Sequence, residues 1–325
     1  MNRSRPALTL TMALALTGVT VVAVAQSLPK LAQKKVYKVG FAQTESNNPW
    51  RIAQTKSMQD EAKRLGHQLV YTDAAGSAAK QVSDVDSMIA QRVDAIFLAP
   101  REEKPLAAAV KKARAAGIPV ILLDRNVDQK LAKAGTDYVT FIGSDFIEEG
   151  RRVGNWLAKN KKGEARIIQL LGTTGSSPAN DRRKGFEDAI KGKAGMRILA
   201  SQTGDFARDK GRQVMETLLQ ANPTVNVVYA HNDEMAIGAI AALEAAGKKP
   251  GKDVMVLSID GGREIVKLLV DGKVNYVVEC NPKFGPKAFE TLKNYAAGKA
   301  VPAKIINPDR EFTAANAKSL LSSAY

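Results

Sequence analysis

The chain has 325 residues, 45% hydrophobic and 25% charged, which is the composition of a globular protein long enough for two domains. Its net charge is +15, or 15 − 2 = +13 without Arg3 and Arg5 of a predicted leader. Lysines and arginines are interspersed with acidic residues and form no basic run with interleaved aromatic residues. This pattern argues against nucleic acid as a partner and favours a solvated basic surface.

The first 25 residues are typical of a secretory signal peptide. Two arginines precede an uncharged run from Ala7 to Ala25, which ends in the small-residue pattern Ala23-Val24-Ala25. An uncleaved membrane anchor is the alternative, but Thr, Gly and Ala dilute the run. We therefore predict cleavage near Ala25 and a soluble protein of a bacterial periplasm.

Short apolar, β-branched runs alternate with helical patterns along the rest of the chain. Segments such as 105–117 and 235–251 have helical spacing and end in Gly or Pro. The strand-like runs cover residues 37–42, 67–73, 94–100, 119–125 and 138–144, and then 165–172, 196–202, 225–233, 254–260 and 275–280. Apolar strands that are each followed by a helix predict parallel sheets covered on both faces.

The number of strands predicts two similar α/β lobes. Ten units are too many for one common open sheet, and they divide five and five between residues 140 and 162. No long Gly/Ser linker separates the halves, so we expect the lobes to pack closely. The single cysteine, Cys280, can form no internal disulfide, and a core of this size does not need one.

Polar and aromatic residues follow many of these runs and are candidate ligand contacts. In open parallel sheets, ligands bind beyond the carboxyl ends of the strands. The candidates at these ends are Glu45, Asn48, Trp50, Arg51, Asp124 and Arg125 in the first half, and Arg182, Phe206, Asn232, Asp260 and Glu279 in the second. If the lobes face each other, these side chains line the cleft between them.

Simpler structural roles exist for several of these positions. Asp or Asn after a strand is often a helix N-cap, the role expected for Asp145, while Asp233 suits either a cap or a ligand contact. Trp50 and Phe206 also fit as ordinary core aromatics. Asp124, followed by Arg125, is different, because no helical pattern starts there and a cap does not require an arginine.

The charges of the candidates favour an uncharged ligand. The candidates include three arginines and the three acids Asp124, Asp260 and Glu279, so an anion would be repelled by the acids and a cation by the arginines. A neutral polyol suits both, because each hydroxyl donates to a carboxylate and accepts from Arg or Asn. Aromatic rings cover the apolar C–H face of a sugar, so the set points to a monosaccharide.

An enzyme is the alternative class. Paired carboxylates hydrolyse glycosides, and Asp124, Asp260 and Glu279 could be read that way. Each acid, however, has a basic or amide candidate beside it, which suits fixed hydrogen bonding better than a raised pKa. The chain has two histidines, no metal-binding spacing, no phosphate loop and no dinucleotide fingerprint. We therefore expect no catalysis, metal or cofactor.

The order of the motifs adds a family resemblance. "NNPW", "IFLAP", "GIPVILLDR", "DRRKGF", "YAHNDEMAIGAIAAL", "SIDG" and "ECNPKFGP" follow one another along the chain. From about Tyr37 onwards the chain resembles the periplasmic sugar-binding proteins of the ribose-binding type, which feed ABC transporters, and most of all their galactofuranose-binding members. The resemblance implies a type I periplasmic binding protein with two Rossmann-like lobes and a three-segment hinge.

The resemblance also implies boundaries and roles. The N-terminal lobe would take residues 36–141 and 280–308, and the C-terminal lobe 142–279 and 309–325. Trp50 and Arg51 stand where ribose binders have two aromatic residues. Glu279 stands where they have Gln, near a hinge crossing. Both changes favour a ligand more polar than ribose, such as a hexose in furanose form, and the ribose-type "SNNPWR" leaves the exact sugar open.

The leading hypothesis is a monomeric, non-catalytic protein that closes around a monosaccharide, galactofuranose first. It would deliver the sugar to an ABC permease and its cytoplasmic ATPase. The alternatives are another sugar such as ribose or arabinose, a sugar-sensing component for a membrane receptor, a glycosidase, or a cytoplasmic regulator with the same two lobes. The lack of a poised acid–base pair disfavours the glycosidase, and the predicted leader disfavours the regulator.

Overall fold

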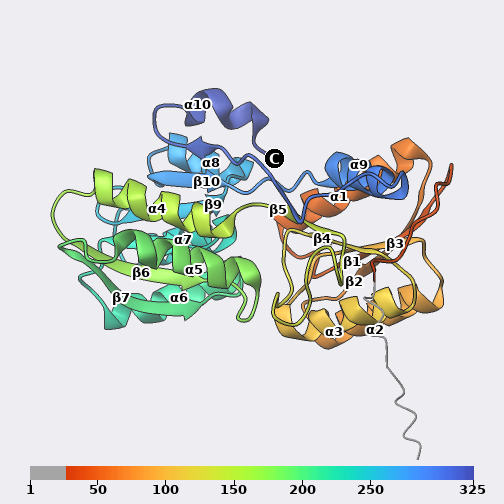
Figure 1. Ribbon diagram of the computed structural model, residues 1–325. Coiled ribbons are helices and arrows are strands. Elements are labelled where there is room, and N and C mark those ends of the chain that lie inside the picture. Colours follow the sequence, from red (N-terminus) through yellow and green to blue (C-terminus); the bar gives the residue numbers. More distant parts are fainter. Residues whose placement is uncertain (1–26) are drawn as a thin grey trace, which may run out of the picture.

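The computed structural model describes residues 27–325, which form two α/β lobes lying side by side (Figure 1). The predicted signal peptide, residues 1–25, lies outside the described residues. Between residues 27 and 325, no helix has the length and hydrophobicity of a membrane span. The predicted architecture of two similar α/β lobes is confirmed.

The first lobe is built on a six-stranded parallel sheet in the order β11-β5-β4-β3-β1-β2. Its strands are β1 (Lys38–Gln43), β2 (Gln68–Asp73), β3 (Ala95–Leu98), β4 (Val120–Leu123), β5 (Thr140–Gly143) and β11 (Lys304–Ile306). Two helix pairs cover it on opposite sides in Figure 1, α1 (Pro49–Leu65) with α9 (Gly285–Ala296), and α2 (Ala78–Ala90) with α3 (Glu103–Ala115).

The second lobe repeats this plan in the order β12-β10-β9-β8-β6-β7, with only β12 antiparallel to its neighbour. Its strands are β6 (Ala165–Leu171), β7 (Met196–Thr203), β8 (Val227–Ala230), β9 (Met255–Asp260), β10 (Tyr276–Glu279) and β12 (Glu311–Phe312). Its helices are α4 (Phe146–Asn160), α5 (Ser177–Ile190), α6 (Arg208–Ala221), α7 (Asp233–Ala245), α8 (Arg263–Val270), α10 (Ala317–Leu320) and the short 3₁₀ helix η1 (Leu321–Ser323).

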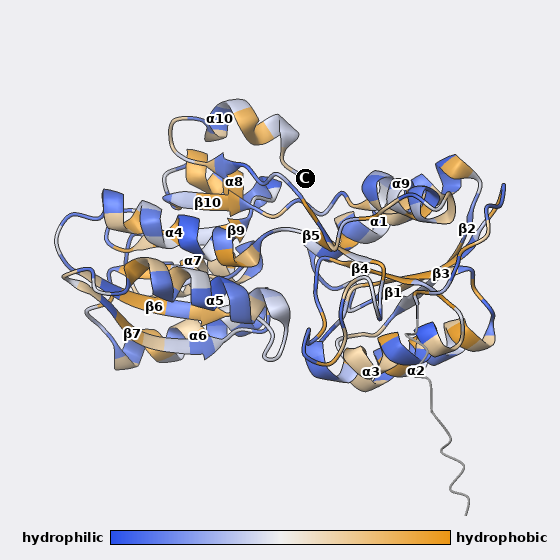
Figure 2. Cartoon of the chain, viewed as in Figure 1, coloured by the Kyte–Doolittle hydropathy of each residue, from blue (hydrophilic) through white to orange (hydrophobic). Residues whose placement is uncertain are grey.

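The apolar core lies on both faces of each sheet, as expected for buried parallel strands. In β6, Ile167 belongs to the cluster that contains Phe186 of α5, while the next residue, Ile168, belongs to the cluster with Met215 of α6. Figure 2 shows the strands as largely hydrophobic and the helices as striped. Alternate side chains of one strand therefore hold helices on opposite faces.

The helix starts place polar groups at the carboxyl edges of the sheets. Asn48 caps α1 by accepting a hydrogen bond from the Arg51 backbone nitrogen at 2.9 Å. Asp145 caps α4 through the Glu148 nitrogen at 3.0 Å, so its predicted role is confirmed. At α7 the cap is Asn232, not its neighbour Asp233.

All ten strand-like runs coincide with strands, but β11 and β12 were not predicted. The chain passes between the two sheets three times, after β5, after β10 and after β11. β5 stays paired in the first sheet as far as Gly143, past the expected lobe boundary at 141, because Gly143 still pairs with Ile306 of β11.

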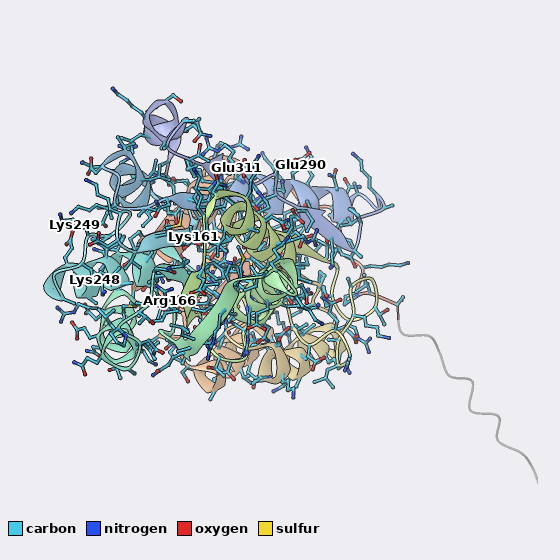
Figure 3. All side chains as sticks on the ribbon, turned by 90° about the vertical axis from the view of Figure 1, so that its left-hand side faces the viewer. Lys161, Arg166, Lys248, Lys249, Glu290 and Glu311 are labelled. Atoms are coloured by element: carbon cyan, nitrogen blue, oxygen red, sulfur yellow. The ribbon has the colours of Figure 1, made fainter. Side chains whose placement is uncertain are left out.

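Charged side chains project from the surfaces of both lobes (Figure 3). Lys161, Arg166, Lys248 and Lys249 extend from the end of the second lobe that faces away from the first. Three of them precede the amino ends of strands and Arg166 is the second residue of β6, whereas the polar residues predicted to bind a ligand lie at or after the carboxyl ends. The two kinds of polar surface are therefore separated by the length of the sheet.

Candidate functional site

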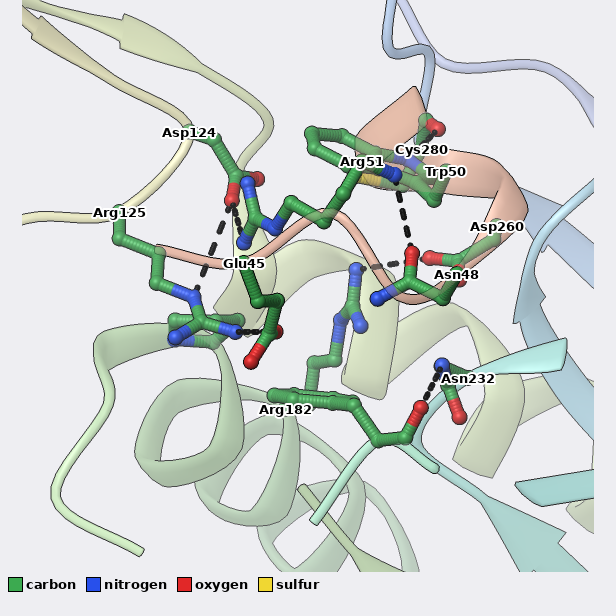
Figure 4. A pocket seen from close by; sticks show the side chains of 12 residues that line it. Glu45, Asn48, Trp50, Arg51, Asp124, Arg125, Arg182, Asn232, Asp260 and Cys280 are labelled. Carbon is green, nitrogen blue, oxygen red and sulfur yellow. Dashed lines mark hydrogen bonds and ion pairs between the residues drawn. The ribbon is translucent and has the colours of Figure 1, made fainter. Parts of the chain in front are cut away.

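A cavity lies between the lobes, with about 330 Å³ of space between atoms that includes solvent at its open mouth. Figure 4 shows side chains from both lobes pointing toward one another there. Its wall consists of Glu45, Asn48, Trp50, Arg51, Asp124, Arg125, Pro178, Arg182, Phe206, Asn232, Asp260 and Cys280. Ten of the eleven side chains singled out in the sequence thus meet at one place, and Pro178 and Cys280 are additions.

Arg51 is held in the first turn of α1 by two partners from the same lobe. Its Nη2 lies 2.6 Å from Oδ2 of Asp124, and its Nη1 donates to Oε1 of Gln54 at 2.9 Å. Both ion-pair side chains are about 5% exposed, so solvent screens this pair little. Asp124 has a positive φ of 61°, an unusual conformation that follows directly after β4.

Arg125 is buried behind this pair. Its Nη2 lies 3.6 Å from Oε1 of Glu45, and its Nε lies 3.9 Å from Oδ2 of Asp124. Burial, together with the nearby Arg51 charge, lowers the pKa of Arg125 to about 9. The first lobe therefore presents two guanidiniums and two carboxylates that neutralise one another.

Arg182 of α5 supplies the cation of the second lobe. Its Nε donates to Oε2 of Glu149 at 2.7 Å, and its Nη1 donates to the carbonyl of His231 at 2.6 Å. Its Nη2 lies 3.5 Å from Oδ1 of Asp260. Burial raises the pKa of the Asp260 carboxyl well above its usual range, and the Arg182 charge offsets part of that shift.

Glu149 lies behind Arg182 rather than in the cavity wall. Burial raises its pKa to about 8, and the Arg182 charge opposes the rise. Nothing in the sequence separates Glu149 from other helical acids, because its role depends on the face of α4 that is buried.

Phe206 is presented to the cavity by a strained loop. Asp205 and Phe206 have φ angles of 58° and 59°, the left-handed region that side chains other than glycine seldom adopt. The guanidinium carbons of Arg125 and Arg182 lie 5.4 Å and 5.9 Å from the ring centre. A Cβ at Gly172 would lie 1.9 Å from the ring, so the glycine makes room for it.

Trp50 joins the cavity wall to a hinge crossing. Its Nε1 donates to the carbonyl of Cys280 at 2.7 Å, and its ring packs edge-on against Phe284 at 6.0 Å. The guanidinium carbon of Arg51 lies 4.6 Å from the ring centre. Trp50 is therefore both a buried aromatic and part of the cavity wall.

Asn232 both caps α7 and belongs to the cavity wall, whereas the sequence leaves the choice between these two roles open for Asp233. Its Oδ1 caps α7 by accepting from the Met235 nitrogen at 3.0 Å, and its Nδ2 donates to the carbonyl of Phe206 at 3.1 Å. Asp233 is turned away from the cavity, with its carboxylate bonded to Oγ of Ser258 at 2.6 Å and to the nitrogen of Gly262 at 2.7 Å.

Glu279 lies outside the cavity wall, contrary to the role expected for it. Its Oε2 accepts from the backbone nitrogen and Nε of Arg310 at 3.0 Å and 2.8 Å, and its Oε1 accepts from Nη2 at 2.5 Å. With its carboxylate occupied in this way, Glu279 ties β10 to the segment that enters β12. The idea that this carboxylate marks a more polar ligand has no support in the geometry.

Within residues 27–325, no group of His, Cys, Asp and Glu is arranged to hold a metal ion. The cavity offers hydrogen-bond donors, acceptors and two aromatic rings, each fixed by partners in the protein. This arrangement suits binding of a small polar molecule.

Comparison with known proteins agrees with this geometry. Residues 39–300 match the model of the periplasmic binding protein domain. The chain belongs to that family. It is 40% identical over 287 residues to the galactofuranose-binding protein YtfQ of Escherichia coli (strain K12), covering 87% of this chain and 89% of the relative.

Two solved structures are also similar. A Mycobacterium smegmatis protein in complex with β-D-fucofuranose shares 45% identity with a TM-score of 0.84, covering 88% of this chain and 94% of that one. The arabinose ABC transporter component of Shewanella sp. ANA-3, bound to L-arabinofuranose, shares 38% identity with a TM-score of 0.83, covering 88% and 95%. The resemblance inferred from the motifs is therefore confirmed.

Proposed function

We propose that this protein captures a monosaccharide in furanose form, galactofuranose foremost, and delivers it to an ABC importer. One observation carries the proposal: three guanidiniums and three carboxylates converge in one cavity and sum to 3 − 3 = 0. They are Arg51, Arg125, Arg182, Glu45, Asp124 and Asp260. A neutral ligand gains hydrogen bonds from both signs without leaving a charge unpaired.

The lining of the cavity fits a sugar. Carboxylates accept from hydroxyls, guanidiniums donate to their oxygens, and Phe206 and Trp50 offer apolar faces to the C–H groups.

The relatives support the furanose form. One of the three similar proteins is named as a galactofuranose-binding protein, and the other two have fucofuranose or arabinofuranose bound in their structures. These sugars share a five-membered ring but differ in their substituents. The mutually paired arginines and acids on both sides of the cavity supply fixed contacts for ring hydroxyls. The substituent beyond the ring then decides which of these sugars binds best.

Capture works by closure of two lobes on a hinge. In this proposal the N-terminal lobe comprises residues 36–143 and 280–308, and the C-terminal lobe comprises 144–279 and 309–325, which moves the first boundary from 141 to the end of β5. Only the closed state brings both halves of the wall to the sugar, so the sugar shifts the equilibrium toward closure. The protein acts as an exported monomer, cleaved near Ala25, that presents its closed form to an inner-membrane permease with its ATPase.

We propose binding without reaction because Asp124 is paired with Arg51 and is not free to act as a base. Asp260, whose pKa is raised by burial, lies near Arg182 and serves as a fixed hydrogen-bonding group. Glu279 is bonded to Arg310 outside the cavity. No cofactor takes part.

Calorimetric titration of the mature protein with D-galactose, D-fucose, L-arabinose and D-ribose tests the proposal. We expect saturable heat with one sugar per chain, tightest for galactose after correction for its furanose fraction. NMR of the bound ¹³C-labelled sugar should show a furanose ring. Absence of heat with every sugar would refute the proposal, and a tighter ribose complex would change the substrate.

A further inference from the structure

Arg101 stands immediately behind the cavity wall, in the loop between β3 and α3. It is buried, and its guanidinium reaches in two directions. Nη1 donates to Oε2 of Glu45, a wall residue of the same lobe, at 2.5 Å. Nη2 donates to Oδ1 of Asp205, which belongs to the opposite lobe, at 3.0 Å. One side chain thus connects a cavity carboxylate to the other lobe.

The backbone of Arg101 is fixed on both sides. Its nitrogen donates to Oε1 of Gln81 at 2.7 Å, and its carbonyl accepts from Nη1 of Arg125 at 3.1 Å. Gln81 in turn donates to the carbonyls of Ala42 and Ala99, at the carboxyl ends of β1 and β3. The orientation of the Arg101 guanidinium is therefore set by hydrogen bonds to residues at the edge of the sheet.

Asp205 is aimed at Arg101 by its own strained loop. Its nitrogen donates to Oγ1 of Thr203 at 3.1 Å, and its φ of 58° is followed by 59° at Phe206. The same turn thus places one ring in the cavity and one carboxylate against the other lobe. Such strain persists only where surrounding contacts hold it.

We propose that Arg101 is a closure-linked positioning residue: by bridging Glu45 and Asp205, it couples the orientation of a cavity carboxylate to contact between the lobes and slows release of the sugar. This inference rests on the proposed function for the identity of the ligand. The Arg101–Asp205 bond joins residues of the two lobes and requires their approach, whereas the Arg101–Glu45 bond lies within the first lobe.

This arrangement predicts which rate constant changes. The sugar is uncharged, so a charge at the cleft rim does not steer its approach, and association is insensitive to Asp205. Loss of a bond made on closure speeds opening, so dissociation accelerates. Loss of Arg101 has a larger effect, because it also frees Glu45, whose other basic partner, Arg125, is 3.6 Å away.

The structure offers a matched control between the same two lobes. Nδ2 of Asn180 donates to Oε2 of Glu103 at 2.7 Å, and neither residue is part of the cavity wall. Asn180→Ala removes one bond between the lobes without touching the Arg101 network. Its effect on sugar release should multiply with that of Arg101→Gln, as expected for independent contacts.

The test uses Trp50 as a fluorescent reporter. The chain has two tryptophans, so Trp156→Phe leaves Trp50 as the only one, and stopped-flow mixing with the best sugar gives both rate constants. We expect Asp205→Asn to raise the dissociation rate about threefold to fivefold. Arg101→Gln should raise it about 30-fold or more. Association should stay within about twofold of the parent in each case.

The double variant shows whether Arg101 and Asp205 slow sugar release through one shared contact or through independent contacts. In the Arg101→Gln background, Asp205→Asn should cause no further acceleration, and thermal melts should show every variant folded. Unchanged dissociation in Asp205→Asn, or effects of the two substitutions that multiply, would overturn the proposal.

If the parent protein binds no sugar, the proposed function fails. The inference about Arg101 is then tested by comparing the shapes of the parent and the variant in solution. Small-angle scattering should then show Arg101→Gln to be more open than the parent. Identical scattering curves would overturn the inference on its own.

Discussion

The two halves of the cavity wall hold their arginines in different ways. In the first lobe, Arg51 pairs with Asp124, so cation and anion both face the ligand. In the second lobe, Arg182 is bonded at short distance to Glu149 and the His231 carbonyl from behind, and reaches Asp260 only at 3.5 Å. The Arg51–Asp124 pair of the first half is therefore self-paired within the wall, whereas Arg182 of the second half depends on buried residues outside the wall.

This difference predicts unequal costs of mutation. Removing a member of a self-paired set leaves its partner near the ligand, where a hydroxyl or water can replace the lost bond. Removing Arg182 leaves the Glu149 carboxylate buried without a cation, and such a group is expensive to keep.

The largest expected effect is that of Arg182→Ala. It should weaken sugar binding by about 2–5 kcal/mol, because it removes a buried donor and leaves Glu149 and Asp260 unpaired. The neighbouring Arg183, whose Nε donates to Glu187 on the exposed surface, provides the matched control. Calorimetry should show near-parental affinity for Arg183→Ala, and equal affinities for the two variants would remove Arg182 from the site.

Asp124→Asn should have a smaller effect. The amide keeps the shape but loses the charged acceptor for a sugar hydroxyl and the partner of Arg51, which costs about 1.5–3 kcal/mol of binding. Asp128→Asn, four residues along the same loop, is the control because Asp128 is outside the wall. An affinity loss larger than that of Arg182→Ala would reverse the comparison between the halves.

The second half should also carry a distinctive pH dependence of stability. Burial, with the charges of Arg182 and Arg183, lowers the pKa of His231 well below 6.5, and Nε2 of His231 lies 3.0 Å from the Gln169 amide. The folded histidine stays neutral while the unfolded one gains a proton below about 6.5. Its stabilising contribution is therefore complete above pH 6.5 and is lost as the pH falls.

His231→Gln isolates this contribution. Between pH 6.5 and 5, the parent should lose unfolding free energy relative to the variant, with a slope that steepens toward about 1.4 kcal/mol per pH unit as the unfolded histidine becomes fully protonated. Urea titrations at each pH measure the difference. A difference that does not change with pH would show that His231 titrates alike in both states.

The smallest expected effect on binding is that of Glu279→Gln. Because Glu279 is bonded to Arg310 and lies outside the wall, sugar affinity should stay within about twofold of the parent. Stability should fall, since a buried charged acceptor of Arg310 is lost. A tenfold loss of sugar affinity with an unchanged free energy of unfolding would show that Glu279 contacts the sugar.

Glu279 marks the limit of what the sequence could predict about the cavity wall. The carboxyl ends of parallel strands meet at one edge of a sheet, and this rule was enough to predict that Asp124, Asp260 and the other predicted wall residues lie together. Successive side chains of a strand point to opposite sides, however, and an apolar run does not say which side faces the cleft. Cys280 lines the cavity, and Glu279 before it points to Arg310.

Other features carried too weak a signal. Arg101 follows a strand in the same way as Arg125, and only its two partners in space distinguish it. Glu149 sits inside a helix, where its burial depends on how α4 packs on α5. β11 and β12 have three and two residues, too few for an alternating pattern to be seen.

A crystal structure of the mature protein with D-galactose tests the central claim most directly. The account predicts one furanose ring between the lobes, with hydroxyls within hydrogen-bond distance of Asp124 and Arg51 on one side and Arg182 and Asp260 on the other. A sugar bound by one lobe alone, or seated outside this cavity, would contradict it.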